Sequence, residues 1–205
     1  MTPPVRRIVI ATHNTHKTGE FRELLGAGWL VEDLTAYSAL PVPVEDGDTF
    51  EANAGIKAGS AAGRLGAGVL VVADDSGLEV DALAGRPGIF SARYAGPGAS
   101  DAGNRDLVLR EMTGVLDRRA RFRCVLAVAR EGEVVACFSG TVEGRLAGQA
   151  EGRGGFGYDP IFIPEGHEAT FAELPAAVKN GLSHRARALG KLMTWLEDAE
   201  LTSRV

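Results

Sequence analysis

Two adjacent carboxylates interrupt an apolar stretch in the first half of the chain. Residues 70–73 are apolar, and Asp74 and Asp75 follow directly. Adjacent acids repel each other and lose hydration when buried, so folding alone does not favour them at the end of a strand. Such a position is where α/β sheets bind ligands, and Mg²⁺ prefers oxygen ligands. The pattern favours a magnesium–phosphate site, and the alternative is an Asx turn that uses one of the two acids.

A polar hexapeptide follows the first apolar run. The segment THNTHK, residues 12–17, lies between a predicted strand and a predicted helix. A turn of this type points backbone N–H groups and the positive end of the helix dipole at a ligand. Thr12 and Asn14 add neutral donors and Lys17 adds a charge, so the segment is a candidate phosphate cradle. It lacks the glycines of a P-loop, and the alternative is an N-cap beside a surface lysine.

A second acidic stretch, VEDGDTFEAN, precedes an alanine-rich segment. Glu45 is a candidate second carboxylate for the same metal ion. Asp48 and Glu51 have the spacing of a capping box, which predicts a helix that starts at Asp48. Lys57, further along this helix, is interpreted as a solvated lysine.

The glycine-rich segment GRGGFGYDP is a candidate base-binding loop. Its glycines allow the backbone to approach a flat ligand, and either Phe156 or Tyr158 is a candidate to stack on it. Asp159 is a candidate acceptor for hydrogen bonds from a base edge. The alternative is a loop whose aromatic side chains fill the core.

Three further basic residues near the C-terminus are candidates, and two of them stand against local preference. Lys179 precedes a glycine-containing turn, and His184 and Arg185 fall in the first turn of the last predicted helix. Cations at that end oppose the helix dipole, so their placement indicates a binding site. Arg187 and Lys191 are interpreted as a solvated face.

The elements that must position these residues alternate between the two periodicities. Apolar and β-branched runs predict strands at residues 6–12, 29–34, 69–73, 120–130, 133–144 and within 160–164. Helical spacing and capping residues predict helices at residues 16–28, 48–65, 100–113 and 183–201. Residues 131–132 join two alternating strands as a hairpin. This order predicts an α/β fold with a mixed sheet flanked by helices.

Composition limits the class of protein. The chain has 205 residues, which suits one domain over residues 1–205, and a net charge of −5, which argues against a broad nucleic-acid-binding surface. No apolar run approaches the ~20 residues of a membrane span, so we expect no membrane partner and a cytoplasmic location. Cys124 and Cys137 are expected to be reduced core thiols.

Taken together, these segments resemble the inosine triphosphate pyrophosphatase family, the dITP/XTP pyrophosphatases. The resemblance extends from Ile8 to about Trp195. It rests on five motifs in order: ATHNTHK, TFEANAGIKA, ADDSGLEVDALAGRPGIFSARYAG, GRGGFGYDPIF and FAELPAAVKNGLSHRARAL.

The resemblance implies a fold, an assembly and a reaction. The expected fold is an elongated α/β structure of two lobes with a central nucleotide-binding cleft, usually in a homodimer. The expected reaction is Mg²⁺-dependent hydrolysis of non-standard purine nucleoside triphosphates (ITP, dITP, XTP) to the monophosphate and pyrophosphate. The small-molecule nucleotide is then the substrate, and no nucleic acid is a partner.

The resemblance also implies a set of site residues. Asp75 would accept the proton and bind the metal, with Glu45 as the other metal ligand. The residues implied in substrate binding are Thr12, His13, Asn14, Thr15, His16, Lys17, Ser76, Phe156, Gly157, Tyr158, Asp159, Lys179, His184 and Arg185. His13 and His16 stand where small residues are common in the family.

A mechanism and its alternatives follow. The hypothesis is that Asp75 would orient a water for attack at the α-phosphorus and that pyrophosphate would leave on Mg²⁺ and Lys17, with Lys57 as a further candidate. Donors from Arg185 or His184, together with backbone amides of the Phe156 loop, would select a 6-oxo purine over adenine. The alternatives are a pyrophosphatase for other modified nucleotides, a non-catalytic nucleotide sensor and a purely structural subunit.

Overall fold

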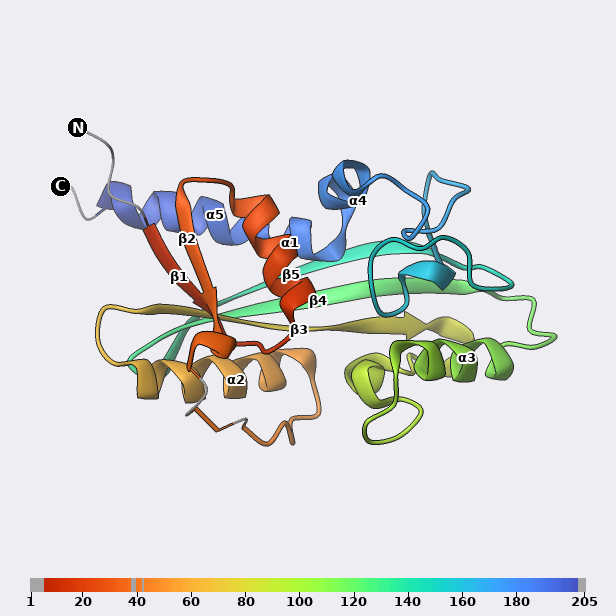
Figure 1. Ribbon diagram of the computed structural model, residues 1–205, viewed down its shortest axis with the longest axis horizontal. Coiled ribbons are helices and arrows are strands. Elements are labelled where there is room, and N and C mark those ends of the chain that lie inside the picture. The colour runs from red at the N-terminus through yellow and green to blue at the C-terminus, as the bar shows by residue number, and fades with distance from the viewer. Residues whose placement is uncertain (1–5, 38–39, 42, 203–205) are drawn as a thin grey trace. The chain divides into compact units, whose positions relative to one another are not determined.

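A mixed sheet runs through the protein (Figure 1). The computed structural model describes residues 6–37, 40–41 and 43–202, and within them the strand order is β2-β1-β3-β4-β5-β6. Strand β1 is parallel to β2 and β3, whereas β5 is antiparallel to β6. The strands are β1 (Arg6–Ile10), β2 (Trp29–Asp33), β3 (Leu70–Val80), β4 (Arg119–Arg130), β5 (Glu133–Leu146) and β6 (Phe162–Pro164).

Five α-helices accompany the sheet in the described residues. They are α1 (Thr15–Leu25), α2 (Phe50–Leu65), α3 (Asp101–Glu111), α4 (Ala176–Leu182) and α5 (His184–Thr202). The prediction of an α/β fold with a mixed sheet is confirmed. Helix α4 was not predicted, and Lys179 lies inside it rather than ahead of a turn. The prolines of residues 38–48 predict a loop before α2, and residues 38, 39 and 42 of this segment lie outside the described residues.

The chain divides into two compact units. The first unit comprises the described parts of Met1–Asp75, Val125–Ser139 and Ala188–Val205, and the second comprises Ser76–Cys124 and Gly140–Arg187. Strands β3, β4 and β5 and helix α5 each contribute residues to both units. The prediction of a single domain over residues 1–205 stays a prediction.

Strand β3 extends beyond its predicted end. Its parallel pairing with β1 covers Leu70 to Val72, opposite Ile8 to Ile10. The strand itself continues through Asp74 and Asp75 to Val80. The acids therefore lie just past the end of the parallel ladder but inside the strand, so the prediction that the strand stops before them is wrong.

The start of α2 differs from the predicted capping box. Thr49, not Asp48, is the N-cap, and its hydroxyl accepts a hydrogen bond from the Ala52 N–H at 3.1 Å. Threonine and aspartate are both good N-caps, so the sequence alone did not separate two neighbouring candidates. Asp48 is exposed.

The predicted hairpin between β4 and β5 is present and packs against α2. Its turn residues, Glu131 and Gly132, both have positive φ angles, of 53° and 91°. The turn lies against glycines of α2 that share one face: a Cβ atom at Gly59 would lie 2.9 Å from the Gly132 carbonyl oxygen, and one at Gly63 would lie 3.5 Å from the Gly132 Cα. Glycine at 59 therefore allows the close approach of helix and turn.

Two cations of α5 contact backbone carbonyls of β5. Arg187 Nη1 donates to the Thr141 carbonyl at 2.8 Å within the second unit, and Lys191 Nζ donates to the Ser139 carbonyl at 2.6 Å within the first. Both side chains are exposed, so the interpretation of these residues as a solvated face is confirmed, and their charged ends also contact the strand.

The prediction of a reduced thiol in the core is confirmed for Cys124 and wrong for Cys137. Cys124 is buried, whereas Cys137 is exposed, and neither is in a disulfide. Within the described ranges, every helix falls short of the length or apolarity that a membrane span needs.

Candidate functional site

The turn of residues 12–17 is capped by its own side chains. Asn14 is the N-cap of α1, and its Oδ1 accepts hydrogen bonds from the N–H groups of His16 and Lys17. Thr12 Oγ1 accepts from the Asn14 N–H at 3.1 Å. His13 and Thr15 are exposed. The N-cap alternative is therefore right for this turn, and a phosphate would have to replace these local caps to use its amides.

Lys17 is not a surface lysine. Its Nζ forms an ion pair with Asp74 and also lies 3.3 Å from the Asp74 carbonyl oxygen. The Asp74 side chain is fully buried. One acid of the pair is thus neutralised by the lysine of the first motif, which answers why a buried strand tolerates it.

Lys57 neutralises the second acid, Asp75, in the same way. Its Nζ lies 2.6 Å from Asp75 Oδ1, 3.4 Å from Glu45 Oε2 and 3.1 Å from the Asp74 carbonyl oxygen. Only 12% of its side chain is exposed, so its interpretation as a solvated lysine is wrong. The two carboxylates predicted to bind metal therefore converge on one point, although Glu45 and Asp75 are 30 residues apart in the chain.

The electrostatics of this cluster balance burial against attraction. Burial raises the pKa of Asp75 and the Glu45 carboxylate adds to that, while Lys57 and Lys17 oppose it without cancelling it. Burial lowers the pKa of Lys57, but the combined attraction of Asp75, Glu45 and Asp74 outweighs it and leaves that pKa raised. A carboxylate with a raised pKa is a better proton acceptor than an exposed one.

The donor set fits a hard divalent cation. Asp75 Oδ2 is buried, and no hydrogen-bond partner for it lies among the described residues. An unsatisfied carboxylate oxygen beside a second carboxylate is the chemistry that Mg²⁺ requires. No cluster of three or more His, Cys, Asp or Glu side chains suited to a metal occurs within residues 6–37, 40–41 and 43–202. Two carboxylates would leave the remaining positions of such an ion to water or to other oxygen ligands.

A buried asparagine ties the acidic loop to α2. Asn53 is 0% exposed, and its Oδ1 accepts the Gly47 N–H at 2.9 Å. A Cβ at Gly47 would lie 2.7 Å from the Ala52 Cβ, so only glycine lets the loop approach this closely. Asn53 was missed from the sequence, although it precedes Lys57 by one helical turn and shares its face, which is a signal that could have found both.

The second unit holds the other group of predicted residues, built around Phe156. Lys179 Nζ lies 5.2 Å and Arg185 Cζ 5.8 Å from the centre of the Phe156 ring, both within cation–π range. Lys179 Nζ also lies 2.6 Å from Asp159 Oδ2, and both side chains are buried. A half-buried aromatic ring that lies beside two cations can stack on a flat ligand that carries polar groups.

The start of α5 completes this group. Arg185 is 1% exposed and its Nη2 donates to Ser76 Oγ at 3.2 Å. The His184 ring stacks on Phe122 with centroids 4.8 Å apart. Ser183 Oγ accepts the Ala186 N–H at the start of α5. Lys179, His184 and Arg185 are therefore buried inside the second unit rather than exposed on its surface.

The loop itself has few free backbone donors. The N–H groups of Phe156 and Gly157 donate to Asp159 Oδ2 and Asp101 Oδ2, both at 2.8 Å, and the Asp159 N–H donates to the Phe156 carbonyl. The predicted use of these amides to select a 6-oxo base is therefore not available in this conformation. Selection by side chains such as Arg185 remains.

The two aromatics of the loop have different environments. The Tyr158 ring belongs to the core cluster of the second unit, and its hydroxyl donates to the Ser91 carbonyl at 2.8 Å. The core-filling alternative is right for Tyr158, which leaves Phe156 as the ring able to stack on a ligand.

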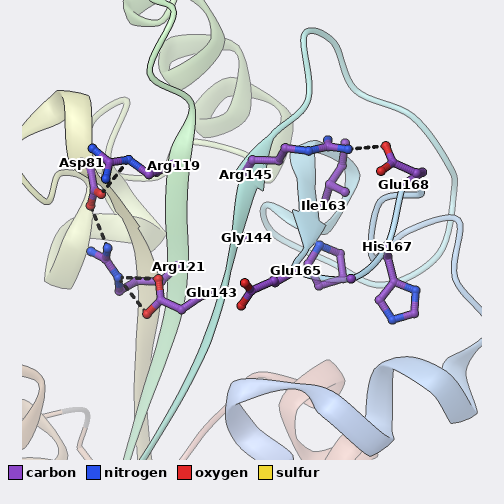
Figure 2. A pocket seen from close by; sticks show the side chains of 12 residues that line it. Asp81, Arg119, Arg121, Glu143, Gly144, Arg145, Ile163, Glu165, His167 and Glu168 are labelled. Atoms are coloured by element: carbon purple, nitrogen blue, oxygen red, sulfur yellow. Dashed lines mark hydrogen bonds and ion pairs between the residues drawn. The ribbon is translucent and has the colours of Figure 1, made fainter.

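A separate pocket of about 680 Å³ lies elsewhere in the second unit (Figure 2). Its charged walls are paired: Arg121 lies between Asp81 and Glu143, Arg119 contacts Asp81, and Arg145 contacts Glu168. None of the predicted site residues lines it. Because the opposite charges on its walls offset each other, the pocket gives no basis for assigning an ionic ligand.

The fold and these side chains define a class: an α/β protein with a buried lysine–carboxylate cluster in one unit and an aromatic ring flanked by cations in the other. The chain belongs to the Ham1 family, whose model matches residues 8–195.

Curated relatives cover nearly the whole chain. A dITP/XTP pyrophosphatase of Shouchella clausii is 47% identical over 195 residues, covering 94% of this chain and 98% of the relative. A dITP/XTP pyrophosphatase of Bacillus subtilis is 46% identical over 196 residues, covering 94% and 98%.

Solved structures agree with the sequence relatives. The Ham1 protein of Staphylococcus aureus is 40% identical with a TM-score of 0.83, covering 95% of this chain and 100% of that one. A HAM1 protein from Coxiella burnetii is 41% identical with a TM-score of 0.83, covering 94% and 99%. The predicted family is therefore confirmed.

Proposed function

We propose that this protein hydrolyses non-standard purine nucleoside triphosphates, such as ITP, dITP and XTP, to the monophosphate and pyrophosphate. The observation that carries the proposal is the convergence of Glu45 and Asp75 on Lys57, with Lys17 on Asp74 beside it. Three acids and two lysines at one place suit a metal–triphosphate complex, which brings both positive and negative charge. The names of the relatives, dITP/XTP pyrophosphatase, support the same reaction.

Asp75 is the proposed proton acceptor. The oxygen of a water forms the new bond to the α-phosphorus, the bond from this phosphorus to the bridging oxygen breaks, and the proton of the water passes to Asp75. Burial raises the pKa of Asp75 and so strengthens it as a base. General-base catalysis of this type contributes roughly 10²–10⁴-fold.

Glu45 and Asp75 are the proposed ligands of magnesium. When bound, the ion would offset the charge of the phosphates and of the departing pyrophosphate. Asn53 would act indirectly, because its bond to the Gly47 N–H holds the loop that carries Glu45.

The two lysines are the proposed partners of the phosphates. Lys17 and Lys57 already lie against Asp74 and Asp75, so a triphosphate would share them with these acids. The segment of residues 12–17 would contribute its amides by exchanging local caps for phosphate oxygens.

The residues of the second unit are the proposed base site. Phe156 would stack on the purine, and Arg185 and His184 would donate to its 6-oxo group. Lys179 would hold Asp159 and the Phe156 ring in place, and Ser76 follows the catalytic Asp75 directly in β3. A site that requires an acceptor at this position rejects adenine, whose 6-amino group leaves the buried donors unpaired.

The assembly and location are part of the proposal. A homodimer is proposed from the family resemblance, and so is a cytoplasmic location, because that is where the nucleotide pool lies. Sedimentation of the purified protein would give a mass of twice the 21.5 kDa chain.

The deciding experiment measures pyrophosphate release. The purified protein is assayed with ITP, XTP, dITP, dUTP, GTP and ATP, with Mg²⁺ and with EDTA. The proposal expects release from ITP, dITP and XTP well above that from ATP, and loss of release with EDTA that added Mg²⁺ restores. Preference for dUTP would favour an enzyme for modified pyrimidines, and nucleotide binding without release would favour a sensor.

A further inference from the structure

Helix α3 holds the base-binding loop through one residue, Gly157. Asp101 Oδ2 accepts the Gly157 N–H at 2.8 Å, and Arg105 Nη1 donates to the Gly157 carbonyl at 2.7 Å. These two bonds engage the peptide groups on either side of Gly157, so they restrain both of its backbone dihedrals. Gly157 has a φ of +59°, a conformation that glycine reaches easily and also leaves easily.

The helix that supplies these bonds is well anchored. Asp101 and Arg105 are one turn apart and share a face of α3. Ser100 caps the helix through the Gly103 N–H, and Asn104, 1% exposed, accepts the Ala95 N–H and donates to the Ala92 carbonyl. A well-anchored helix therefore fixes the position of the loop that it contacts. A binding site with precise geometry needs support from such a rigid element.

The neighbours of Gly157 explain why its conformation matters. Phe156, on one side, is the ring that faces Lys179 and Arg185, and Tyr158, on the other, is fixed in the core by its bond to Ser91. Tyr158 and Asp159 anchor the loop after Gly157. Asp159 also holds the N–H and the carbonyl of Phe156, so the bonds from α3 add a second restraint, placed at the residue between the ring and the core anchor.

We propose that Asp101 and Arg105 are positioning residues that preset the Phe156 loop and thereby set the affinity and selectivity for the base. The inference rests on the proposed function, since it assigns the loop to base binding. A ring that is held in place before binding loses less conformational entropy when the base stacks on it. The bond to Asp101 also occupies an amide that would otherwise be a free donor, which narrows the set of bases that the loop can accept.

The test uses two substitutions with matched controls. Asp101→Ala and Arg105→Ala each remove one bond to Gly157. Asp101→Asn removes the same charge at the start of α3 but keeps an acceptor oxygen. Asp106→Asn and Arg110→Ala change one charge each on the same helix, at exposed positions.

The measurements are kcat and KM for ITP and ATP, and binding of IMP and AMP by calorimetry. Because hydrogen bonds to charged groups are among the stronger ones, we expect KM for ITP and Kd for IMP to rise by roughly 10-fold or more in each alanine variant. We expect kcat to stay within a few-fold and the ITP/ATP ratio of kcat/KM to fall. Asp101→Asn should restore most of the affinity, and both controls should match the parent protein.

The outcomes separate this inference from the proposed function. A parent protein that shows no preference for ITP over ATP contradicts the proposed function itself. If the parent protein prefers ITP and the alanine variants keep both its KM for ITP and its ITP/ATP ratio of kcat/KM, the positioning role is contradicted. A fall in kcat that is equal for ITP and ATP and accompanies a lower melting temperature also contradicts it, because loss of stability alone would produce that result.

Discussion

At the scale of single residues, the paired acids of β3 have different partners. Asp74 is neutralised by Lys17 and Asp75 by Lys57, and both lysines come from other elements. Asp75 keeps one buried carboxylate oxygen for which the described residues supply no partner. The two acids are therefore not equivalent: Asp74 fixes a lysine, whereas Asp75 retains capacity for a ligand and for a proton.

Asp75→Asn should lower kcat for ITP by roughly 10²–10⁴-fold, because an amide cannot accept the proton of the attacking water. The amide oxygen can still accept the hydrogen bond of Lys57, so we expect the far-ultraviolet circular dichroism to be unchanged. Steady-state assays at saturating Mg²⁺ give the measurement.

Asp48→Asn is the control for this change. Asp48 is an exposed acid in the same acidic stretch as Glu45. Its change to Asn removes the same negative charge, but outside the lysine–carboxylate cluster. It should retain the activity of the parent protein. Activity of Asp75→Asn within a few-fold of the parent would reject Asp75 as the base.

At the scale of elements, the glycines of α2 decide how closely the β4–β5 turn can pack. Gly59→Ala places a methyl group 2.9 Å from the Gly132 carbonyl, whereas Gly63→Ala places one 3.5 Å from the Gly132 Cα, which is an ordinary contact. Alanine gains about 1 kcal/mol over glycine in a helix, and overpacking costs about 1–3 kcal/mol. We expect Gly63→Ala to stabilise the protein and Gly59→Ala to destabilise it.

Urea unfolding of the two alanine variants measures this difference. Each serves as the control for the other, because both change glycine to alanine in the same helix. Equal stability of the two variants would show that the turn does not pack against Gly59 as described.

The end of β2 provides a test of pH dependence. Asp33 is buried and its Oδ1 accepts hydrogen bonds from the Thr35 N–H and hydroxyl. Burial raises the pKa of Asp33, but the hydrogen bonds, chiefly those from Thr35 and Thr18, outweigh it and leave the pKa below its ordinary value. The stabilisation is therefore present above the unfolded pKa of about 3.9 and is lost as pH falls through the lower folded pKa.

Asp33→Asn should lower the free energy of unfolding at pH 7 by about 1–2 kcal/mol, since hydrogen bonds to a charged group are the stronger ones. The difference from the parent protein should shrink as the pH falls below about 3.9. Denaturant unfolding between pH 7 and pH 3 gives the measurement. A difference that grows toward acid pH would mean that the sign of the pKa shift is wrong.

At the scale of the whole molecule, the two units share the three longest strands and the longest helix of the described residues. Strands β3, β4 and β5 and helix α5 each contribute residues to both units, so unfolding one unit would interrupt elements that the other needs. We therefore expect a single cooperative thermal transition, with equal calorimetric and van't Hoff enthalpies at fixed protein concentration. Two resolved transitions would contradict the prediction of one domain.

Local sequence was sufficient for the elements with strong signals. The β-branched run at β1, the periodicity of α1 and the Glu131-Gly132 turn were predicted and are present, because these depend on neighbours in the chain. The second half of β3 was missed, because its polar and small residues carry no strand signal by themselves. Neighbouring strands, rather than intrinsic propensity, decide such a segment.

The amino-acid sequence by itself determined the family, the α/β class and the residue types of the site, because motifs and periodicity are local properties of the chain. Only the tertiary structure decided which charges meet. It brought Lys57 to Asp75 and Glu45, took Tyr158 into the core, and used Asp101 and Arg105 to hold Gly157. The physical reason is that the energy of a buried charge or a held loop depends on distances between residues far apart in the chain, and only the folded chain sets those distances.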